Sequence, residues 1–369
     1  MAERWSDVFT TMIEPTTGCN LRCRYCYSDS EDGRVMSHEV LSLALEKATR
    51  HAEENGFKEI HLIWHGGEPL LVGMDFFQQA ISILDGLHSS LSCRHFVQTN
   101  GLLLDDEYCR FFRDTNFEVG VSLDGPSEVH NQSRIASNGR GTHTEVMEKV
   151  HLLEKHQVPI GFNAVISQAS KGKARDIYRF FQDLRYGFRV NPVIPGWGCH
   201  ETQDYLLGEG DYGEFLCWLF DEWTSTEKDR VSVSPLDMHV RAILDGEATE
   251  CQQLPSCIGL HLGIKPGGEA VLCSRFERHV LGDIQTMSIS DLFSSPVCKQ
   301  IQERTDALSG CHTCPDWGIC HGGCPHNAIA FQGRFHERDP FCKDYQMIFR
   351  HIRRIVQSSR QEDLEAKTL

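Results

Sequence analysis

The strongest constraint on the fold is an alternation, between about Val8 and Pro195, of apolar β-branched runs with longer amphipathic runs. Such alternation is typical of strand–helix units around a parallel sheet. Six strands are expected, at residues 9–14, 59–64, 95–99, 118–123, 161–166 and 188–193. The expected helices lie at residues 37–55, 75–88, 105–114, 142–156 and 174–186, with Ser37, Asp75 and Asp105 as N-terminal caps. Because a closed barrel needs eight such units, the sequence predicts an α/β fold in which residues 1–195 form a partial (β/α)6 barrel.

The rest of the chain changes character twice. Residues 196–250 contain helical stretches rich in aromatic and acidic residues, at 211–224 and 235–244, which predict a helical bridge. Residues 251–345 are loop-rich, with many Cys, Gly and Pro residues, and are expected to need metal because they cannot build a large apolar core. Helical periodicity returns afterwards, so residues 346–369 are expected to form a C-terminal helix.

Composition limits the partners that this chain can bind. Its formal net charge is −16, from 52 acidic and 36 basic residues. A nucleic-acid backbone or an anionic membrane surface would require a basic face that this composition does not supply. No leading stretch resembles a signal peptide, and no run approaches the roughly 18 apolar residues of a membrane span. The sequence therefore predicts a cytoplasmic protein with no nucleic-acid and no membrane partner.

The chain contains 16 cysteines. The cytosol keeps thiols reduced, so metal ligation is a better interpretation than disulfide bonds. All but five of the cysteines fall into two groups, one near the N-terminus and one in the last third of the chain. The scattered ones are expected to be small buried hydrophobic residues: Cys93, Cys109, Cys199, Cys217 and Cys298. Cys199 also follows the sixth predicted strand closely enough to lie near the mouth of the barrel.

The N-terminal group consists of Cys19, Cys23 and Cys26, directly after the first predicted strand. Three thiolates at this spacing can hold three irons of a cubane cluster and leave the fourth open to a small molecule. Spacing alone also allows a zinc site. Because the turns after parallel strands gather at one face, polar and glycine-rich turns at residues 65–69, 98–101 and 122–126 are expected beside these cysteines. The sequence thus predicts a metal site with an open position at the barrel mouth.

This C-x3-C-x2-C pattern, with Tyr25 before its third cysteine, resembles the signature of radical S-adenosylmethionine (SAM) enzymes. The resemblance implies a [4Fe–4S] cluster whose open iron binds SAM, and cleavage of SAM to a 5′-deoxyadenosyl radical that removes a hydrogen atom from the substrate. The SAM contacts that it implies are Gly66, Gly67 and Glu68 in a glycine motif, Ser122 and Asp124 at the ribose or carboxylate, and Arg134 at the carboxylate. His65, which precedes the motif, is a candidate mouth residue.

The second group holds eight cysteines, four of them in the dense run C-x2-C-x5-C-x3-C. Spacing fits two four-cysteine cubanes or two four-thiolate zinc sites. The pattern resembles the SPASM domain of radical SAM maturases, which carries two auxiliary [4Fe–4S] clusters. The resemblance implies an inner cluster on Cys251, Cys257, Cys273 and Cys324 and an outer cluster on Cys311, Cys314, Cys320 and Cys342. Since neither has an open iron, both are expected to carry an electron from the substrate or to shape its pocket.

Two kinds of maturase share features with this chain. Residues 64–71 resemble peptide maturases that cross-link an aromatic side chain to a neighbouring β-carbon, so cyclophane formation in a ribosomally made peptide (RiPP) is the leading hypothesis. The alternative is an anaerobic sulfatase maturase, which converts a Cys or Ser to formylglycine. In those enzymes an aspartate, thought to act as the base, follows the third SPASM cysteine. Here Ser274 stands in its place, and Glu269 or Glu277 would have to substitute.

A second alternative is a non-catalytic Fe–S electron-transfer or binding protein, although such a protein has no need for an open cluster or for the turns around it. The expected partners are a peptide or protein substrate and an electron donor such as a flavodoxin or ferredoxin. Because the first strand starts near Phe9, no N-terminal peptide-recognition domain is expected. Leader binding would then use the bridge, the SPASM surface or a separate protein.

Overall fold

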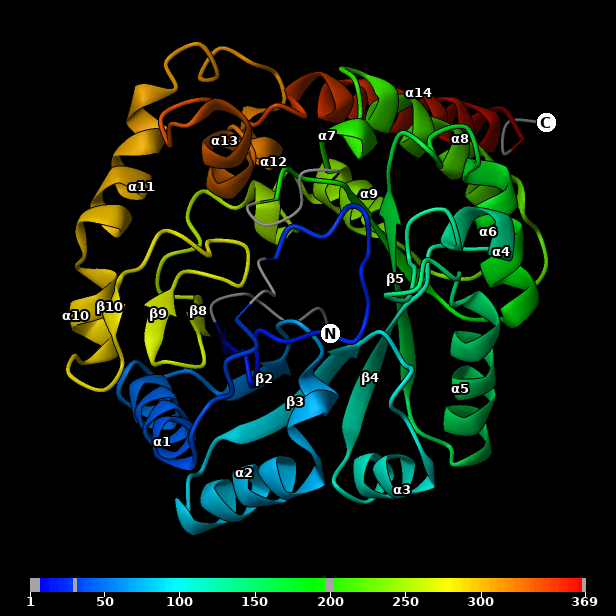
Figure 1. Ribbon diagram of the computed structural model, residues 1–369. Helices are drawn as coiled ribbons and strands as arrows, with labels where there is room; N and C mark the ends of the chain where they lie inside the picture. Colours follow the sequence, from blue (N-terminus) through cyan, green and yellow to red (C-terminus); the bar gives the residue numbers. More distant parts are fainter. Residues whose placement is uncertain (1–6, 29–31, 197–201, 367–369) are drawn as a thin grey trace.

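The structure is a computed structural model that describes residues 7–28, 32–196 and 202–366 (Figure 1). Within these residues one sheet of ten strands has the order β10-β9-β8-β1-β2-β3-β4-β5-β6-β7. Neighbouring strands are parallel, except that β9 runs antiparallel to both β8 and β10. The strands are β1 (Val8–Ile13), β2 (Glu59–Trp64), β3 (Ser92–Thr99), β4 (Phe117–Ser122), β5 (Ile160–Ile166), β6 (Phe188–Pro192), β7 (Val233–Ser234), β8 (His261–Ile264), β9 (Glu269–Val271) and β10 (Gly282–Asp283).

The helices lie outside this curved sheet, as Figure 1 shows for α1, α2, α3 and α5. The α-helices are α1 (His38–Glu54), α2 (Met74–Gly86), α3 (Asp106–Asp114), α4 (Ser127–His130), α5 (His143–Lys155), α6 (Ala174–Leu184), α7 (Thr202–Tyr205), α8 (Asp211–Ser225), α9 (Leu236–Asp245), α10 (Ile289–Phe293), α11 (Pro296–Ala307), α12 (Trp317–Cys320), α13 (Pro325–Gln332) and α14 (Cys342–Ala366). Two short 3₁₀ helices are η2 (Pro69–Val72) and η3 (Cys251–Gln253).

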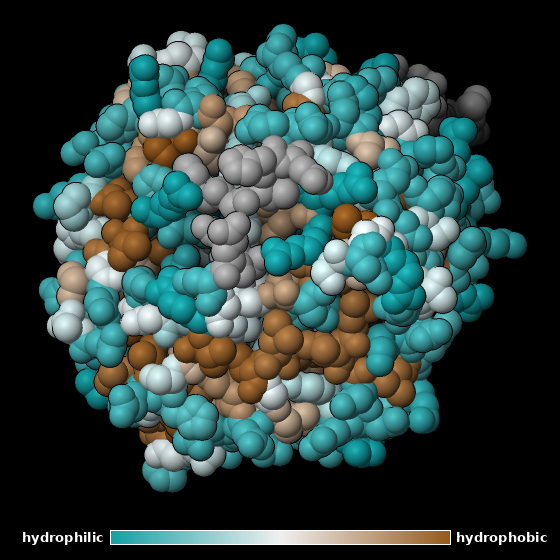
Figure 2. Space-filling model, in the orientation of Figure 1, coloured by the Kyte–Doolittle hydropathy of each residue, from teal (hydrophilic) through white to brown (hydrophobic). Residues whose placement is uncertain are grey.

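The hydrophobic core fills the space between sheet and helices. In β4, Phe117, Val119 and Val121 are fully buried, whereas the residues between them face the inside of the barrel and are half-buried. The rings of Phe77 and Phe112 pack on Phe117 at centroid distances of 6.2 and 5.1 Å. Figure 2 shows a largely hydrophilic rim over the outer helices and a band of apolar side chains within that rim. The inner face of the sheet carries polar side chains, such as Gln98, Ser122 and Asn163, together with apolar ones such as Phe96.

The predicted α/β fold with a partial barrel is confirmed. The six predicted strands are β1 to β6, and β2 has the predicted bounds. The sequence does not predict β7 to β10, because strands of two to four residues are too short to show a periodicity. Strand β8 pairs in parallel with β1. The chain after residue 251 therefore extends the barrel sheet.

Two of the three predicted helix caps are present. The Ser37 side chain accepts a hydrogen bond from the Val40 amide, and Asp105 caps α3. The prediction for Asp75 is wrong: α2 begins one residue earlier, at Met74, and Gly73 occupies the cap position without a side-chain bond. Asp75 therefore lies in the first turn.

The scattered cysteines do not share one environment. Cys109 and Cys298 are fully buried, as expected, and Cys217 is half-buried. The prediction for Cys93 is wrong: its side chain is exposed, because β3 begins at Ser92 and its first two residues lie outside the buried part of the strand. Cys199 lies outside the described residues.

Helices of the expected bridge pack against the C-terminal helix. Tyr212 of α8 contacts Phe341 with ring centroids 5.7 Å apart, and His239 of α9 contacts Phe349 at 5.2 Å. The Asp344 carboxylate accepts a hydrogen bond from the Gly213 amide at 2.7 Å. Across the described ranges, no helix combines the length and apolar character that crossing a bilayer requires.

Candidate active site

Cys19, Cys23 and Cys26 lie together on the loop that follows β1. The Leu21 amide donates to Cys19 Sγ at 3.4 Å, and the Cys26 amide donates to the Cys23 carbonyl at 3.1 Å. Burial raises the pKa of Cys23 to about 12, with the charges of Cys26 and Cys19 contributing, so the three thiols lie close to one another. Buried thiols of this kind stay protonated at neutral pH and ionise when a metal binds to the sulfur. The structure thus brings the predicted ligands into one group.

Gly66 and Gly67 allow the loop after β2 to pack directly on this cysteine loop. Gly66 has φ of +128°, and a Cβ there would lie 2.7 Å from the Thr16 carbonyl oxygen and 2.6 Å from Glu14 Cγ. At Gly67 a Cβ would lie 2.1 Å from the Gly18 carbonyl oxygen. Glycine is required at both positions for the close approach of two backbones.

The Glu68 side chain, a predicted SAM contact, is fully buried and bonded to the protein. The Thr99 hydroxyl and the Leu70 amide donate to its Oε1 at 2.7 and 3.1 Å, and the Asn100 amide donates to Oε2 at 2.8 Å. Burial raises the pKa of Glu68 to about 7, against the effect of these bonds. The Glu68 amide also donates to the Gly18 carbonyl at 2.8 Å. Its carboxyl group therefore fastens the loops after β2 and β3, and only its backbone faces the cysteine loop.

Asp124 and Arg134 form a buried ion pair, with 3.1 Å between Arg134 Nε and Asp124 Oδ1. The Tyr25 hydroxyl donates to Asp124 Oδ2, and the Tyr25 ring centroid lies 5.4 Å from the guanidinium carbon. Because Tyr25 belongs to the cysteine loop, these contacts fix that loop to the end of β4. Ser122, at the end of the same strand, accepts a hydrogen bond from Gln98 Nε2 at 2.9 Å.

His65 lines a small pocket together with Met12, Glu14, Lys265 and Ser274. Its Nδ1 accepts a hydrogen bond from the following backbone amide at 2.6 Å. Burial lowers the pKa of His65 to about 4, so the ring is neutral at physiological pH. With Nδ1 as an acceptor, the proton is on Nε2, which is left as a donor.

Glu14, which the sequence prediction missed, follows β1 and is only 8% exposed. Its amide donates to the Ile264 carbonyl at 2.9 Å, and its side chain lies over Gly66. Burial raises its pKa to about 7. No described residue forms a hydrogen bond or ion pair with its carboxyl group. The sequence signal is an acidic residue that ends an apolar strand just before the cysteines, but only the structure shows that it is buried.

Four cysteines of the second group come together beside this pocket: Cys251, Cys257, Cys273 and Cys324. Burial raises the pKa of Cys257 well above its ordinary value, and the charges of the other three thiols raise it as well. Arg275 lies among them: burial disfavours its charge, but the neighbouring acidic groups, Cys324 and Cys273 first, raise its pKa. Arg275 was not predicted. It supplies a positive charge next to four ionisable thiols.

The two cysteine regions meet at Tyr27 and Ser274. Tyr27 directly follows Cys26, Ser274 directly follows Cys273, and their side chains are hydrogen-bonded. The Ser274 amide also lies 3.5 Å from Met12 Sδ, on β1. The pocket that Ser274 lines is therefore located between the N-terminal cysteines and the second group.

The two acids expected to replace the missing aspartate differ in position. Glu269 is ion-paired with Arg34 at 2.9 Å, and both side chains reach the surface. Glu277 lies near enough to Glu14 to raise the pKa of that residue, and it has contacts of its own. Glu269 is thus engaged elsewhere.

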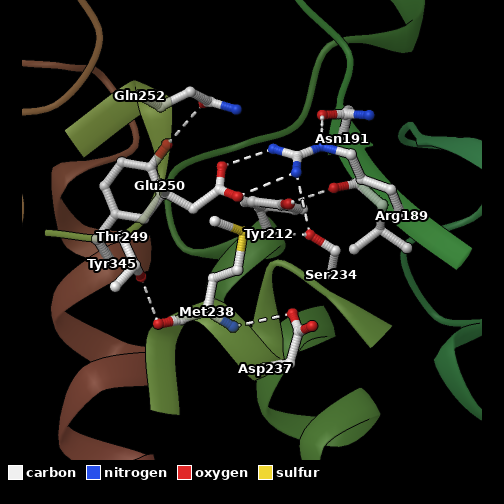
Figure 3. Close-up of polar contacts among 11 residues, drawn as sticks. Arg189, Asn191, Tyr212, Ser234, Asp237, Met238, Thr249, Glu250, Gln252 and Tyr345 are labelled. Atoms are coloured by element: carbon white, nitrogen blue, oxygen red, sulfur yellow. Dashed lines mark hydrogen bonds and ion pairs between the residues drawn. The ribbon is translucent and has the colours of Figure 1, made fainter. Parts of the chain in front are cut away.

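Arg189 and Glu250 anchor the second cysteine group to the barrel (Figure 3). Two nitrogens of the guanidinium contact the two carboxylate oxygens at 3.0 and 2.5 Å. Arg189 also donates to Ser234 Oγ at 3.0 Å and to Asn191 Oδ1 at 3.3 Å. Glu250 is 3% exposed and directly precedes Cys251. This ion pair, which was not predicted, fixes the first cysteine of the group to β6.

The remaining four cysteines form a separate group: Cys311, Cys314, Cys320 and Cys342. Burial raises the pKa of Cys342, and the charges of Cys311 and Cys314 raise it too. Cys342 in turn helps to raise the pKa of Cys320, after burial and Asp339. Gln346 Nε2 donates to Cys314 Sγ at 3.8 Å. The eight thiols therefore divide into two groups of four.

These donor sets fit iron–sulfur clusters. In the part of the chain that the structure describes, no three His, Cys, Asp or Glu side chains converge on the position of a single metal ion. A cubane requires each thiol to reach a different iron, so its ligands need not converge on one point. Thiol groups of three and four, with glycines beside the group of three, are the arrangement that an open cluster and two closed ones require.

Comparison with known families identifies the class of the protein. Residues 13–180 match the radical SAM superfamily, and residues 256–315 match the iron–sulfur cluster-binding domain SPASM. The chain is a radical SAM enzyme with a SPASM domain, as predicted. The first domain binds a [4Fe–4S] cluster and SAM, and the second binds auxiliary iron–sulfur clusters.

More particular similarities are with sulfatase maturases. The chain is 26% identical to the serine-type anaerobic sulfatase-maturating enzyme of Bacteroides thetaiotaomicron, over 92% of this chain and 88% of the relative. It is 28% identical to the cysteine-type enzyme of Clostridium perfringens strain 13, over 92% and 95%. The structure of native anSMEcpe with bound AdoMet superimposes with a TM-score of 0.84 at 25% identity, covering 95% of this chain and 99% of that one. Streptococcus suis SuiB bound to S-adenosylmethionine shares the fold, with a TM-score of 0.67 at 16% identity over 92% and 78%.

Proposed function

We propose that this chain is a maturase that oxidises a side chain of a peptide or protein substrate at the mouth of the pocket between β1, β2 and β9. The observation that carries the proposal is the contact between Tyr27 and Ser274, which joins the N-terminal cysteine loop to the loop of Cys273. A substrate side chain at the mouth of this pocket would lie between two cluster sites. Hydrogen abstraction and electron removal could then act on one bound group without its moving.

In this proposal Cys19, Cys23 and Cys26 hold the cluster that binds SAM. The cluster and SAM, when bound, supply a 5′-deoxyadenosyl radical that takes a hydrogen atom from the substrate. The backbone of the glycine motif and the groups at the end of β4 hold SAM: Gly66, Gly67, Glu68, Ser122, Asp124 and Arg134. Asp124 acts partly by orienting Arg134, because the two are already paired at 3.1 Å.

His65 has a separate role in the proposal. Its ring is neutral and lines the pocket, and its Nδ1 accepts a hydrogen bond from the Gly66 amide at 2.6 Å, which leaves the proton on Nε2. A neutral imidazole donates a hydrogen bond without adding charge. We assign His65 to orienting a carbonyl of the substrate peptide.

Formylglycine formation from Cys or Ser is the reaction that the relatives support best. Maturases of both types align with 92% of this chain. Cyclophane formation, the leading hypothesis from the sequence, is the second candidate. One observation favours it: Ser274 is held by Tyr27 and offers no base in place of the aspartate. Peptide recognition has a precedent in the shared fold, since SuiB is known in a structure bound to the precursor peptide SuiA.

The test uses the enzyme with reconstituted clusters, SAM, and flavodoxin or ferredoxin as the electron donor. The probes are a synthetic sulfatase target peptide with Cys, its Ser and Ala counterparts, and any aromatic-rich short peptide encoded beside the gene. Formylglycine formation predicts an aldehyde that a hydrazide reagent captures from the Cys or Ser peptide only. The Ser peptide should lose two hydrogens, and the Cys peptide should in addition exchange its sulfur for an oxygen from water, with release of hydrogen sulfide. Loss of two hydrogens without an aldehyde would identify a cross-link. If no peptide is modified, the proposal is wrong.

A cysteine variant tests the cluster assignment. Replacing Cys19, Cys23 and Cys26 together by Ala should abolish 5′-deoxyadenosine formation and leave the iron of the auxiliary clusters in place. A matched set, Cys93, Cys109 and Cys298 to Ala, should leave iron content unchanged, since these residues lie outside the groups. SAM cleavage by the first variant would contradict the assignment.

A further inference from the structure

Glu14 is a buried carboxyl group at the edge of the pocket, and none of the residues that the structure describes forms a hydrogen bond or ion pair with it. It is 8% exposed, and it lines the pocket together with His65 and Ser274. Elsewhere in the barrel mouth, the buried carboxylates of Glu68 and Asp124 accept hydrogen bonds from the protein. Burying an unpaired carboxyl group costs free energy. We therefore expect such a group at a pocket wall to contact a ligand when one is bound.

Five charged or titratable groups face Glu14 from the elements around it: Lys265 after β8, Glu277 after β9, Glu269 on β9, Arg34 before α1 and His65 after β2. Burial is the largest influence and raises its pKa, Lys265 and Arg34 lower it, and the two acids raise it, for a result of about 7. Glu14 therefore changes charge in the range where a general base is most effective.

The position of Glu14 matches this chemical use. The space that Gly66 leaves open is filled by the Glu14 side chain, because a Cβ at Gly66 would lie 2.6 Å from Glu14 Cγ. The carboxyl group is thereby held over Gly66, and it lines the same pocket as Ser274. Ser274, the residue after Cys273, has only a hydroxyl group, and Tyr27 occupies it. Among the described residues that line this pocket, Glu14 is the only carboxylate.

On the basis of the proposed function, we propose that Glu14 accepts the proton that the target side chain of the substrate loses. Conversion of a CH₂–SH or CH₂–OH group to CH=S or CH=O removes two hydrogens. One leaves carbon as a hydrogen atom and forms the C–H bond of 5′-deoxyadenosine. The other leaves sulfur or oxygen as a proton and binds the Glu14 carboxylate. The remaining electron would pass to an oxidised auxiliary cluster held by the second cysteine group. For a Cys target, water would then convert CH=S to CH=O with release of hydrogen sulfide.

The experiment compares the wild type with Glu14→Gln, Glu14→Asp and Glu269→Gln in the reconstituted enzyme. The probe is the synthetic sulfatase peptide with Cys, deuterated at the β-carbon. Glu14→Gln should transfer deuterium to 5′-deoxyadenosine at close to the wild-type rate but form at least about 10²-fold less aldehyde. Glu14→Asp should retain aldehyde formation within about tenfold. Glu269→Gln should form aldehyde at the wild-type rate above pH 7, with the rise displaced to lower pH because the charge of Glu269 raises the pKa of Glu14. Aldehyde formation by the wild type should rise through pH 7, the pKa of Glu14, and that rise should be absent in Glu14→Gln.

Infrared spectroscopy gives a readout that does not depend on turnover. The protonated carboxyl band of the wild type should lose intensity through pH 7, and part of that change should be missing in Glu14→Gln. Aldehyde formation by Glu14→Gln at the wild-type rate would overturn the inference. So would loss of peptide-independent SAM cleavage, which would make Glu14 a cofactor contact. If the wild type modifies no peptide, the proposed function fails, and the inference that depends on it fails too.

Discussion

Two buried carboxyl groups stand at neighbouring strand ends, Glu14 after β1 and Glu68 after β2, and their surroundings differ. Burial raises the pKa of each to about 7. Glu68 accepts hydrogen bonds from Leu70, Thr99 and Asn100. Glu14 accepts none from the residues described and faces a pocket. Similar burial and similar pKa values therefore accompany different roles, and the hydrogen-bond partners distinguish them.

The sequence suggests that Glu68 is the more important residue for binding a ligand, whereas the structure favours Glu14. Glu68 stands in a recognisable motif, yet its side chain holds loops together. Glu14 stands outside any motif, yet its carboxyl group is free to act on a ligand. Each difference can be tested by removing one carboxyl group at a time.

The largest effect is expected for Glu68→Ala. The substitution leaves the Thr99 hydroxyl and the amides of Leu70 and Asn100 buried without an acceptor. Each orphaned donor costs about 1–3 kcal/mol, so a loss of roughly 4 kcal/mol in the free energy of unfolding is expected. Anaerobic denaturant titration measures it. Glu54→Ala, on the exposed end of α1, is the control and should change stability by less than about 0.5 kcal/mol. Equal effects of the two variants would refute a structural role for Glu68.

How well the sequence predicts each part of this site depends on the number of consecutive residues that carry the pattern. Strand β2 was predicted with its exact bounds because its six residues alternate between the barrel interior and the buried helix-facing side. Strands β8 and β9, which carry Lys265 and Ser274 into the pocket, have four and three residues, too few for a pattern. The pairing of β8 with β1 is a tertiary contact that no local sequence encodes.

The pairing of the cysteines and the surroundings of Glu250 and Glu14 were also beyond what the sequence could predict. The division of eight thiols into two groups came from a family resemblance, since spacing alone allowed other pairings. Arg189 and Glu250, which meet in Figure 3, are 61 positions apart in the chain and carry no shared motif. Glu14 was identified in the sequence as a strand end, but burial and the absence of a partner are properties of the fold. Charged groups that act through their surroundings are therefore what sequence reasoning misses first.

Unlike Glu68→Ala, the Glu14→Gln substitution should raise the free energy of unfolding, by an amount that depends on pH. Burial raises its pKa from 4.5 to about 7, so this group stabilises the fold fully below pH 4.5, and the contribution is lost as the pH rises through 7. Relative to the wild type, Glu14→Gln should therefore gain about 3 kcal/mol between those limits. Thermal unfolding at acidic and alkaline pH measures the difference. A wild type and variant that respond alike to pH would mean that Glu14 is hydrated or paired.

A smaller effect is expected where the two loops touch. Gly67→Ala places a Cβ 2.1 Å from the Gly18 carbonyl oxygen, so the loops after β1 and β2 must separate. Overpacking of this kind costs about 2 kcal/mol. The shift should lower iron at the N-terminal cluster and leave the auxiliary clusters occupied, as iron and sulfide analysis would show. Gly86→Ala, where a Cβ meets nothing within 4 Å, is the matched control. An unchanged iron content in Gly67→Ala would show that the glycine serves another purpose.

The smallest changes in the free energy of unfolding are expected at the starts of helices α1 and α2, where one side chain makes a cap hydrogen bond and the other does not. The Ser37 hydroxyl accepts a hydrogen bond from the Val40 amide, whereas Asp75 makes no cap bond to α2. Ser37→Ala should cost about 1 kcal/mol, since the Val40 amide loses its acceptor. Asp75→Ala loses only the interaction of one charge with the helix dipole, on the order of 0.3 kcal/mol at an exposed site. Denaturant titration of both variants should rank them in that order. The reverse order would show that charge at a helix start outweighs a cap bond in this fold.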